Sequence, residues 1–267
     1  MVPVSVPVHA LAHRPLTVAA VAELVALPTA PLLPDNDFDT VDAELRRRGW
    51  SWEHELVCDS YRTGHGHVLC TDDADPFGHP DARHFLVFGE LYPVDPDDES
   101  VGNGPWLYDL MDQWREQPGW SERRPSTYGD CEAVLAESAR AVTEHLGTAP
   151  ERTIVSSAAV VTGPAMTHRV WRTSTHALVL GPAADNGPYG YLTHLQLSYT
   201  PLACGPELPT ADATNTADAT NTANTTNATD ATDATDATDA TDATEDETAD
   251  ETDTASLAKW ITAHVDW

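Results

Sequence analysis

Positively charged side chains are scarce in this sequence of 267 residues. It has 14 Lys and Arg against 43 Asp and Glu, a formal net charge of −29. A protein that binds nucleic acid or an anionic membrane needs a basic surface patch. The scarcity therefore excludes both as expected partners, and the charge fits a protein whose partner is basic. Lysine is the rarest charge, because 13 of the 14 basic residues are Arg, a bias typical of a GC-rich genome.

The sequence also lacks paired cysteines and long apolar runs. No apolar run approaches the ~20 residues of a membrane-spanning helix. The apolar stretch 16–27 contains Glu23 and follows a single Arg, unlike a signal peptide. We therefore expect a cytoplasmic protein. Its four cysteines have no CxxC spacing and are interpreted as free thiols of a reducing compartment: Cys58, Cys70, Cys131 and Cys204.

Recognised catalytic motifs are missing as well. There is no GxSxG nucleophile motif, and Gly102-Asn103-Gly104 lacks the strand and helix context of a phosphate-binding loop. The acidic loop 95–99 lacks EF-hand spacing. These absences favour a protein that is not an enzyme and carries no cofactor.

A low-complexity acidic segment stands out among what is present. Residues 211–244 contain only Ala, Asp, Thr and Asn and settle into an Asp-Ala-Thr triplet. The wider segment 207–254 holds 14 acidic residues and no Lys or Arg, yet the other 219 residues still carry 29 acidic against 14 basic ones. Without large apolar side chains the segment cannot offset its ordering entropy, so we predict disorder. A β-solenoid with Thr ladders, or slippage expansion of a repeated codon block, are the other interpretations.

The segment divides the chain into four predicted parts. Residues 1–15, rich in proline, form an extended N-terminal arm, and residues 16–206 form a globular domain. Residues 207–254 form the acidic linker. Residues 255–267 form a C-terminal helix that docks on the domain, because one face of that helix is apolar: Leu257, Trp260, Ile261 and Val265.

Hydrophobic periodicity predicts the elements of the globular domain. Helices are expected at 16–27, from the cap at Asp37 to Gly49, from Pro105 to about Pro118, and from Asp130 to Gly147. Strands are expected over 50–61 and 66–71 as one hairpin, and over 84–92 as a central, nearly all-apolar strand. The segments 170–180 and 189–200 are expected to form a long antiparallel hairpin.

This last hairpin offers a candidate binding patch. A loop symmetric about residue 185 places Trp171 opposite Tyr199 on an apolar face and gathers polar side chains on the other face. The predicted patch consists of Arg172, His176, His194 and Gln196. If a helix covers that face, these groups need partners and can form a site. If the face is open, they form its solvated side.

A second candidate is a histidine-rich segment. His65, His67, His79 and His84 lie within 20 residues, and the spacing of the first two would place them on one face of a strand, where a metal could bridge them. Leu69 occupies the place of the Asp in an HxHxDH metallohydrolase pattern, so the motif is incomplete. The segment is therefore interpreted either as a metal site or as a polar loop.

Three segments carry a resemblance to known proteins: RRRGW at 46–50, EHLGTAP at 144–150, and WRTSTHALVL with YGYLTHLQLSYTP between 171 and 201. They resemble small actinobacterial α+β proteins, including immunity-type proteins of polymorphic-toxin systems. The resemblance implies a cytoplasmic, non-enzymatic protein that binds and neutralises a partner.

Together these observations predict an α+β fold: a mainly antiparallel sheet with helices packed on one face, and a disordered acidic insertion. The predicted function is that of a non-enzymatic interaction protein, of the immunity type, that binds a basic protein. The alternative is a metal-dependent enzyme that uses the His65–His84 cluster.

Overall fold

A computed structural model describes residues 7–28, 38–53, 56, 60–71, 77, 81–93, 105–157, 164–184 and 193–204. The chain divides into two units, Met1–Thr216 and Ala217–Trp267, and every described residue belongs to the first. The predicted linker at 207–254 and the predicted C-terminal helix at 255–267 lie outside the described residues.

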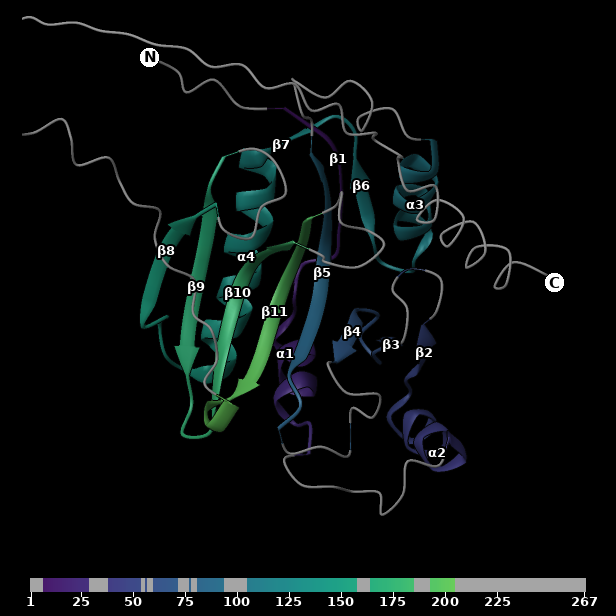
Figure 1. Cartoon of the computed structure of the whole chain (residues 1–267), viewed down its shortest axis with the longest axis vertical. Coiled ribbons are helices and arrows are strands. Elements are labelled where there is room, and N and C mark those ends of the chain that lie inside the picture. Colours follow the sequence, from purple (N-terminus) through teal and green to yellow (C-terminus); the bar gives the residue numbers. More distant parts are fainter. Residues whose placement is uncertain are drawn as a thin grey trace, which may run out of the picture. The chain divides into compact units, whose positions relative to one another are not determined.

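The α+β fold class is confirmed, and the described strands form one eleven-stranded sheet in which every pairing is antiparallel (Figure 1). The order is β2-β3-β4-β5-β11-β10-β9-β8, and β1 pairs with β5, β6 and β7. The strands are β1 (Pro7–His13), β2 (Ser51–Glu53), β3 (Ser60–Arg62), β4 (Val68–Thr71), β5 (His84–Pro93), β6 (Ser121–Arg123), β7 (Ser126–Thr127), β8 (Arg152–Ser156), β9 (Met166–Arg172), β10 (His176–Ala184) and β11 (Thr193–Pro201).

Strand β5 has the central place that its apolar sequence predicts. Along one edge it pairs with β11, and along the other it pairs first with β4 and then with β1. Its side chains are buried on both faces: Leu86 and Phe88 belong to one hydrophobic cluster, while Val87 and Tyr92 belong to another. A strand enclosed in this way reads as a continuous apolar run rather than as an alternating one.

Residues 7–13 of the predicted N-terminal arm are part of the sheet, whereas residues 1–6 lie outside the described residues. Residues 7–13 form β1, in which four side chains are at most 1% exposed: Val8, Ala10, Leu11 and Ala12. The prolines that suggested an arm do not prevent this, because proline is tolerated as the first residue of a strand. Pro7 holds that position.

The hairpin predicted over residues 170–200 is divided by a turn, and its strands pair in a register other than the predicted one. A turn over residues 173–175 splits the segment 170–180 into the end of β9 and the start of β10, and Thr173 Oγ1 accepts a hydrogen bond from the His176 N–H at 2.9 Å. Tyr199 pairs with Leu178 rather than with Trp171, a shift of seven residues. Trp171, Leu195, Leu197 and Tyr199 still share one apolar face, as predicted. The shift by an odd number of residues instead moves His176 onto that face, away from His194 and Gln196.

The first predicted hairpin is also divided. The segment 50–61 contains two short strands, β2 and β3, and the chain continues to β4 in an antiparallel series. Residues 54–55 and 57–59 lie outside the described part.

The described helices follow their sequence signals closely: α1 (Val18–Val25), α2 (Phe38–Arg48), α3 (Pro105–Glu116) and α4 (Tyr128–Leu146), with a short 3₁₀ turn η2 (Leu202–Cys204). Helix α4 begins two residues before the predicted start because Thr127 is its N-cap and Asp130 completes a capping box. Gly147, at a φ of 67°, ends the helix in the left-handed conformation. None of the described helices is long and apolar enough to cross a membrane.

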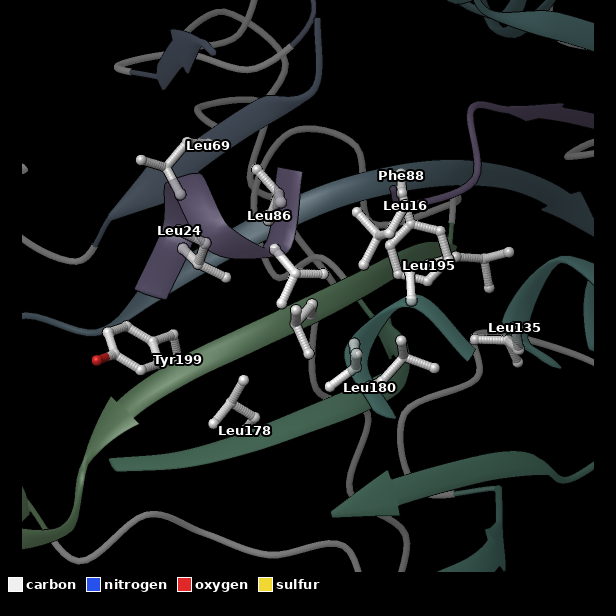
Figure 2. Packing of buried hydrophobic residues seen from close by; sticks show 14 of the residues in the cluster. Leu16, Leu24, Leu69, Leu86, Phe88, Leu135, Leu178, Leu180, Leu195 and Tyr199 are labelled. Atoms are coloured by element: carbon white, nitrogen blue, oxygen red, sulfur yellow. The ribbon is translucent and has the colours of Figure 1, made fainter. Parts of the chain in front are cut away.

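Two hydrophobic clusters cover opposite faces of the sheet. Helices α1 and α4 contribute to the first, together with β4, β5, β10 and β11; Figure 2 shows Leu24 of α1 and Leu135 of α4 around Leu86, Leu180 and Leu195 of these strands. Helix α3 contributes Met111 and Trp114 to the second cluster, against β1 and β5. Neighbouring residues of β5 alternate between the clusters, so the clusters lie on opposite faces.

The close approach of β11 to β5 predicts a sensitive glycine. A Cβ at Gly89 lies 2.9 Å from Leu195 Cδ1, inside van der Waals contact in the core. We expect Gly89→Ala to lower the free energy of unfolding by about 1–3 kcal/mol, the usual effect of overpacking. Urea unfolding followed by circular dichroism measures it.

A matched control is Gly129→Ala in the first turn of α4, where the nearest atom to a new Cβ is Thr127 Oγ1 at 3.5 Å. We expect this variant to be unchanged or more stable by up to about 1 kcal/mol, because alanine favours a helix over glycine. Equal losses in the two variants would contradict the packing of Leu195 on Gly89.

Candidate functional site

The structure does not bring the four residues of the predicted patch together. His176 lies on the face of the first hydrophobic cluster, where its ring stacks on Tyr199 with centroids 4.0 Å apart and planes 8° apart. Burial lowers the pKa of His176. Arg172 lies at the rim and forms an ion pair with Glu151 at 2.9 Å. His194 and Gln196 alternate with Leu195 of the first cluster, so they share the other face of β11.

What the structure places beside His194 is Glu90. The two residues are direct cross-strand neighbours on β11 and β5, and His194 Nδ1 contacts Glu90 Oε1, a contact that is an ion pair when the imidazole is protonated. The side chain of Glu90 is fully buried and that of His194 is 9% exposed. Sequence reasoning missed Glu90, although a signal was present: it is the only acidic residue in the otherwise apolar strand β5, and a buried charge needs a partner.

His168 continues this polar row across the sheet. It lies on β9, and its imidazole packs over Gly181 of β10, where a Cβ would clash with the ring. The ring Nε2 lies 3.2 Å from the carbonyl oxygen of Pro182, and His168 is 3% exposed. Gly181 is in turn the cross-strand neighbour of Gln196. Strands β5, β11 and β9 thus carry one row of polar side chains on the face opposite the first hydrophobic cluster: Glu90, His194, Gln196 and His168.

The chemistry open to this row is limited by its burial. A carboxylate and an imidazole in contact can share a proton, which is the basis of general acid–base catalysis. Here the carboxylate of Glu90 has no exposed surface and His194 almost none, so neither group faces solvent where a substrate could approach. Glu90 and His194 therefore form a buried polar pair between β5 and β11, while the imidazole of His168 contacts the backbone of β10.

The described histidines of the predicted metal cluster are separated. His65 is exposed in the turn before β4, and His67 in the same turn is buried with Nε2 3.1 Å from the carbonyl oxygen of Arg14. His84 begins β5, where it is the cross-strand neighbour of Thr71. His79 lies outside the described residues. Within the described ranges, no three His, Cys, Asp or Glu side chains are grouped so that they could hold a metal ion.

The cysteines of the described chain are free thiols, and the buried one is unsuited to nucleophilic chemistry. Burial, with the nearby carboxylates of Asp130 and Glu132, raises the pKa of Cys131 to about 12. A thiol with this pKa stays protonated at neutral pH, and only the thiolate is a nucleophile. Cys70 is partly buried and Cys204 is exposed, while Cys58 lies outside the described residues.

Comparison with protein-family models, curated proteins and solved structures finds no match to this chain. The resemblance to immunity-type proteins therefore stays a prediction. The functional argument depends on the residues alone.

The buried pair of Glu90 and His194 predicts a non-additive mutant cycle. We expect His194→Leu to lower the free energy of unfolding by about 3–5 kcal/mol, because it leaves the buried carboxylate of Glu90 without its cross-strand partner. The double variant Glu90→Leu/His194→Leu removes both groups and should recover much of that loss. Urea unfolding of both variants measures the coupling, and a double variant less stable than His194→Leu would be the contrary result.

The burial of His67 predicts a pH dependence of stability. Burial, and secondarily the Arg14 guanidinium, lower the pKa of His67 from 6.5 to about 4. The unfolded chain therefore binds this proton more readily than the folded chain does. The stability contributed by the neutral ring is complete above pH 6.5 and is lost as the pH falls toward 4, by about 3 kcal/mol in total.

The variant His67→Gln isolates this effect. Its side chain does not titrate but keeps an amide donor for the Arg14 carbonyl. We expect the stability difference between the wild-type chain and this variant to shrink as the pH falls from 7 to about 4.5. Thermal unfolding across this range measures it, and a difference independent of pH would rule out a buried neutral His67.

Proposed function

We propose that this chain is a non-enzymatic interaction protein of the immunity type that binds a basic protein partner. The observation that carries the proposal is the distribution of charge along the chain. The described residues contain 16 acidic side chains and 13 of the 14 basic ones. The remaining segments hold 27 of the 43 acidic residues and a single cation, Lys259.

The charges of the described residues are largely neutralised by one another. At least eight of the 13 arginines form an ion pair with a carboxylate; examples are Arg48 with Glu44 at 2.8 Å and Arg124 with Glu122 at 2.6 Å. Hydrogen bonds from Arg47 lower the pKa of Glu44 to about 2. These ion pairs use eight of the 16 described carboxylates, and 16 acidic against 13 basic side chains leave the described residues a net charge of only −3.

The acidic residues of the other segments have no such balance. They concentrate in the runs 72–75 and 95–99 and in the segment 207–254, none of which contains Lys or Arg. A field of one sign accelerates the encounter with a partner of opposite charge and selects against partners of like charge. These segments therefore supply the attraction toward a basic protein.

The polar groups within the described fold support binding over catalysis. Glu90, His194 and His168 are buried in the sheet, His67 hydrogen-bonds a backbone carbonyl, and Cys131 is held as a neutral thiol. A catalytic group must reach the substrate at hydrogen-bond distance. These described groups are directed to the interior of the protein instead.

The test is to isolate the partner and measure how its binding depends on charge. The protein is used as bait in its source cells, and captured candidates are re-purified and measured singly by stopped-flow kinetics. We expect a partner with a net positive charge, whose association rate constant falls at least about tenfold between low and physiological salt. A specific partner that is neutral or acidic, or an association rate indifferent to salt, contradicts the proposal.

A charge-neutral version of the acidic segment is the matched control. Replacing the 14 acidic residues of 207–254 by Asn and Gln keeps the length and leaves every described residue unchanged. We expect slower association and a weaker salt dependence, with unchanged dissociation and an unchanged unfolding midpoint. A variant that differs from wild type mainly in dissociation would place the segment within the contact surface rather than in long-range attraction.

A further inference from the structure

A hollow of about 370 Å³ lies between α4 and the sheet strand β9, on the face of the first hydrophobic cluster. Figure 1 shows α4 behind β9 and β10, and both strands contact it. The apolar part of the lining comes from Ala136 and Ala139 of α4 and from Pro150. This volume is at the lower end of the range of about 300–1,000 Å³ for small-molecule sites.

Two arginines give the hollow its charge. Arg169 of β9 enters from the sheet side, where it is the cross-strand neighbour of Leu180, and Arg140 enters from α4. Glu144 also lines the hollow, but no ion pair joins it to either arginine in the described structure, and neither arginine pairs with any other described carboxylate. These two residues thus depart from the pattern of the fold, in which most arginines are paired.

The guanidinium of Arg169 has a further peculiarity. Its Nη1 atom is buried and lacks a hydrogen-bond partner. A buried charged donor without an acceptor destabilises a fold, so such groups are rare unless a ligand or water completes them. Trp171, two residues along on the same face of β9 and 1% exposed, also has its Nε1 donor buried without an acceptor. Two buried donors without an acceptor thus lie on this face of β9.

We propose that the hollow binds a small organic carboxylate. The carboxylate accepts hydrogen bonds from the guanidinium groups of Arg140 and Arg169, and the apolar body of the ligand lies on Ala136, Ala139 and Pro150. Arginine suits this task because its planar fork of donors matches the two oxygens of a carboxylate. The apolar lining favours an organic acid over an inorganic anion. This site stands apart from the proposed basic partner, and either can exist without the other.

The test uses benzoate as the probe and the full chain. Titration is followed by the amide resonances of residues 136–144 and 165–171 in a nitrogen–proton correlation spectrum. We expect saturable shifts confined to these residues, and an affinity at least about tenfold lower in Arg169→Gln and in Arg140→Gln, since each removes a charge-assisted hydrogen bond. The absence of saturable shifts would overturn the proposal.

Arg152→Gln is the matched control. Arg152 is exposed on the adjacent strand β8 and does not line the hollow. Its removal lowers the charge of the chain equally, so benzoate binding should be unchanged in this variant. An equal loss of affinity in Arg152→Gln, or inorganic phosphate binding as tightly as benzoate, would show attraction to positive charge in general and would overturn the assignment.

A stability measurement without ligand separates binding from folding. We expect Arg169→Met to unfold at the same or a higher urea concentration than wild type, because it removes a buried donor that has no acceptor. The same variant should lose benzoate binding. A variant that fails to fold would instead show that Arg169 is a structural residue, against the proposal.

Discussion

The structure depends on the enclosure of strand β5. Each of its edges must be paired and each of its faces covered, because unpaired backbone groups and bare apolar side chains are both unfavourable in a protein interior. Strand β11 satisfies one edge, β4 and β1 share the other, and the two hydrophobic clusters cover the faces. The one acidic residue of this buried strand is Glu90. Because a buried carboxyl group is unfavourable without a polar partner, it requires His194 beside it.

Local signals in the sequence predicted the local structure well. The stop at Gly147 and the proline at the start of α3 are properties of a few neighbouring residues, and helices follow them. The start of α4 was placed two residues late, because the cap at Thr127 was not recognised. The pairing of strands that are distant in the sequence was harder to predict. The turn at 173–175 contains neither Gly nor Pro, and its only signal is the run Thr-Ser-Thr, whose hydroxyls favour turns more weakly. The register that followed from an unbroken strand was wrong.

The candidate site shows the same division. His194 was recognisable as a polar residue in an apolar strand, but its partner comes from β5, far away in the sequence, and only the pairing of β5 with β11 joins them. Arg140 and Arg169 were not singled out because nothing in the sequence distinguishes an unpaired arginine from a paired one. Likewise, composition gave the net charge of the chain but not its partition between a nearly balanced fold and acid-rich segments.

The place of β11 in the sheet has a consequence for how the chain acquires its structure. This strand fills the gap between β5 and β10, yet it is the last strand of the described chain, and its contacts with β5 join residues more than a hundred positions apart. Such long-range pairing is entropically demanding to nucleate and slows folding. During synthesis the neighbouring edges of β5 and β10 stay unpaired until β11 has emerged. The risk of aggregation is therefore greatest in the interval before β11 is synthesised.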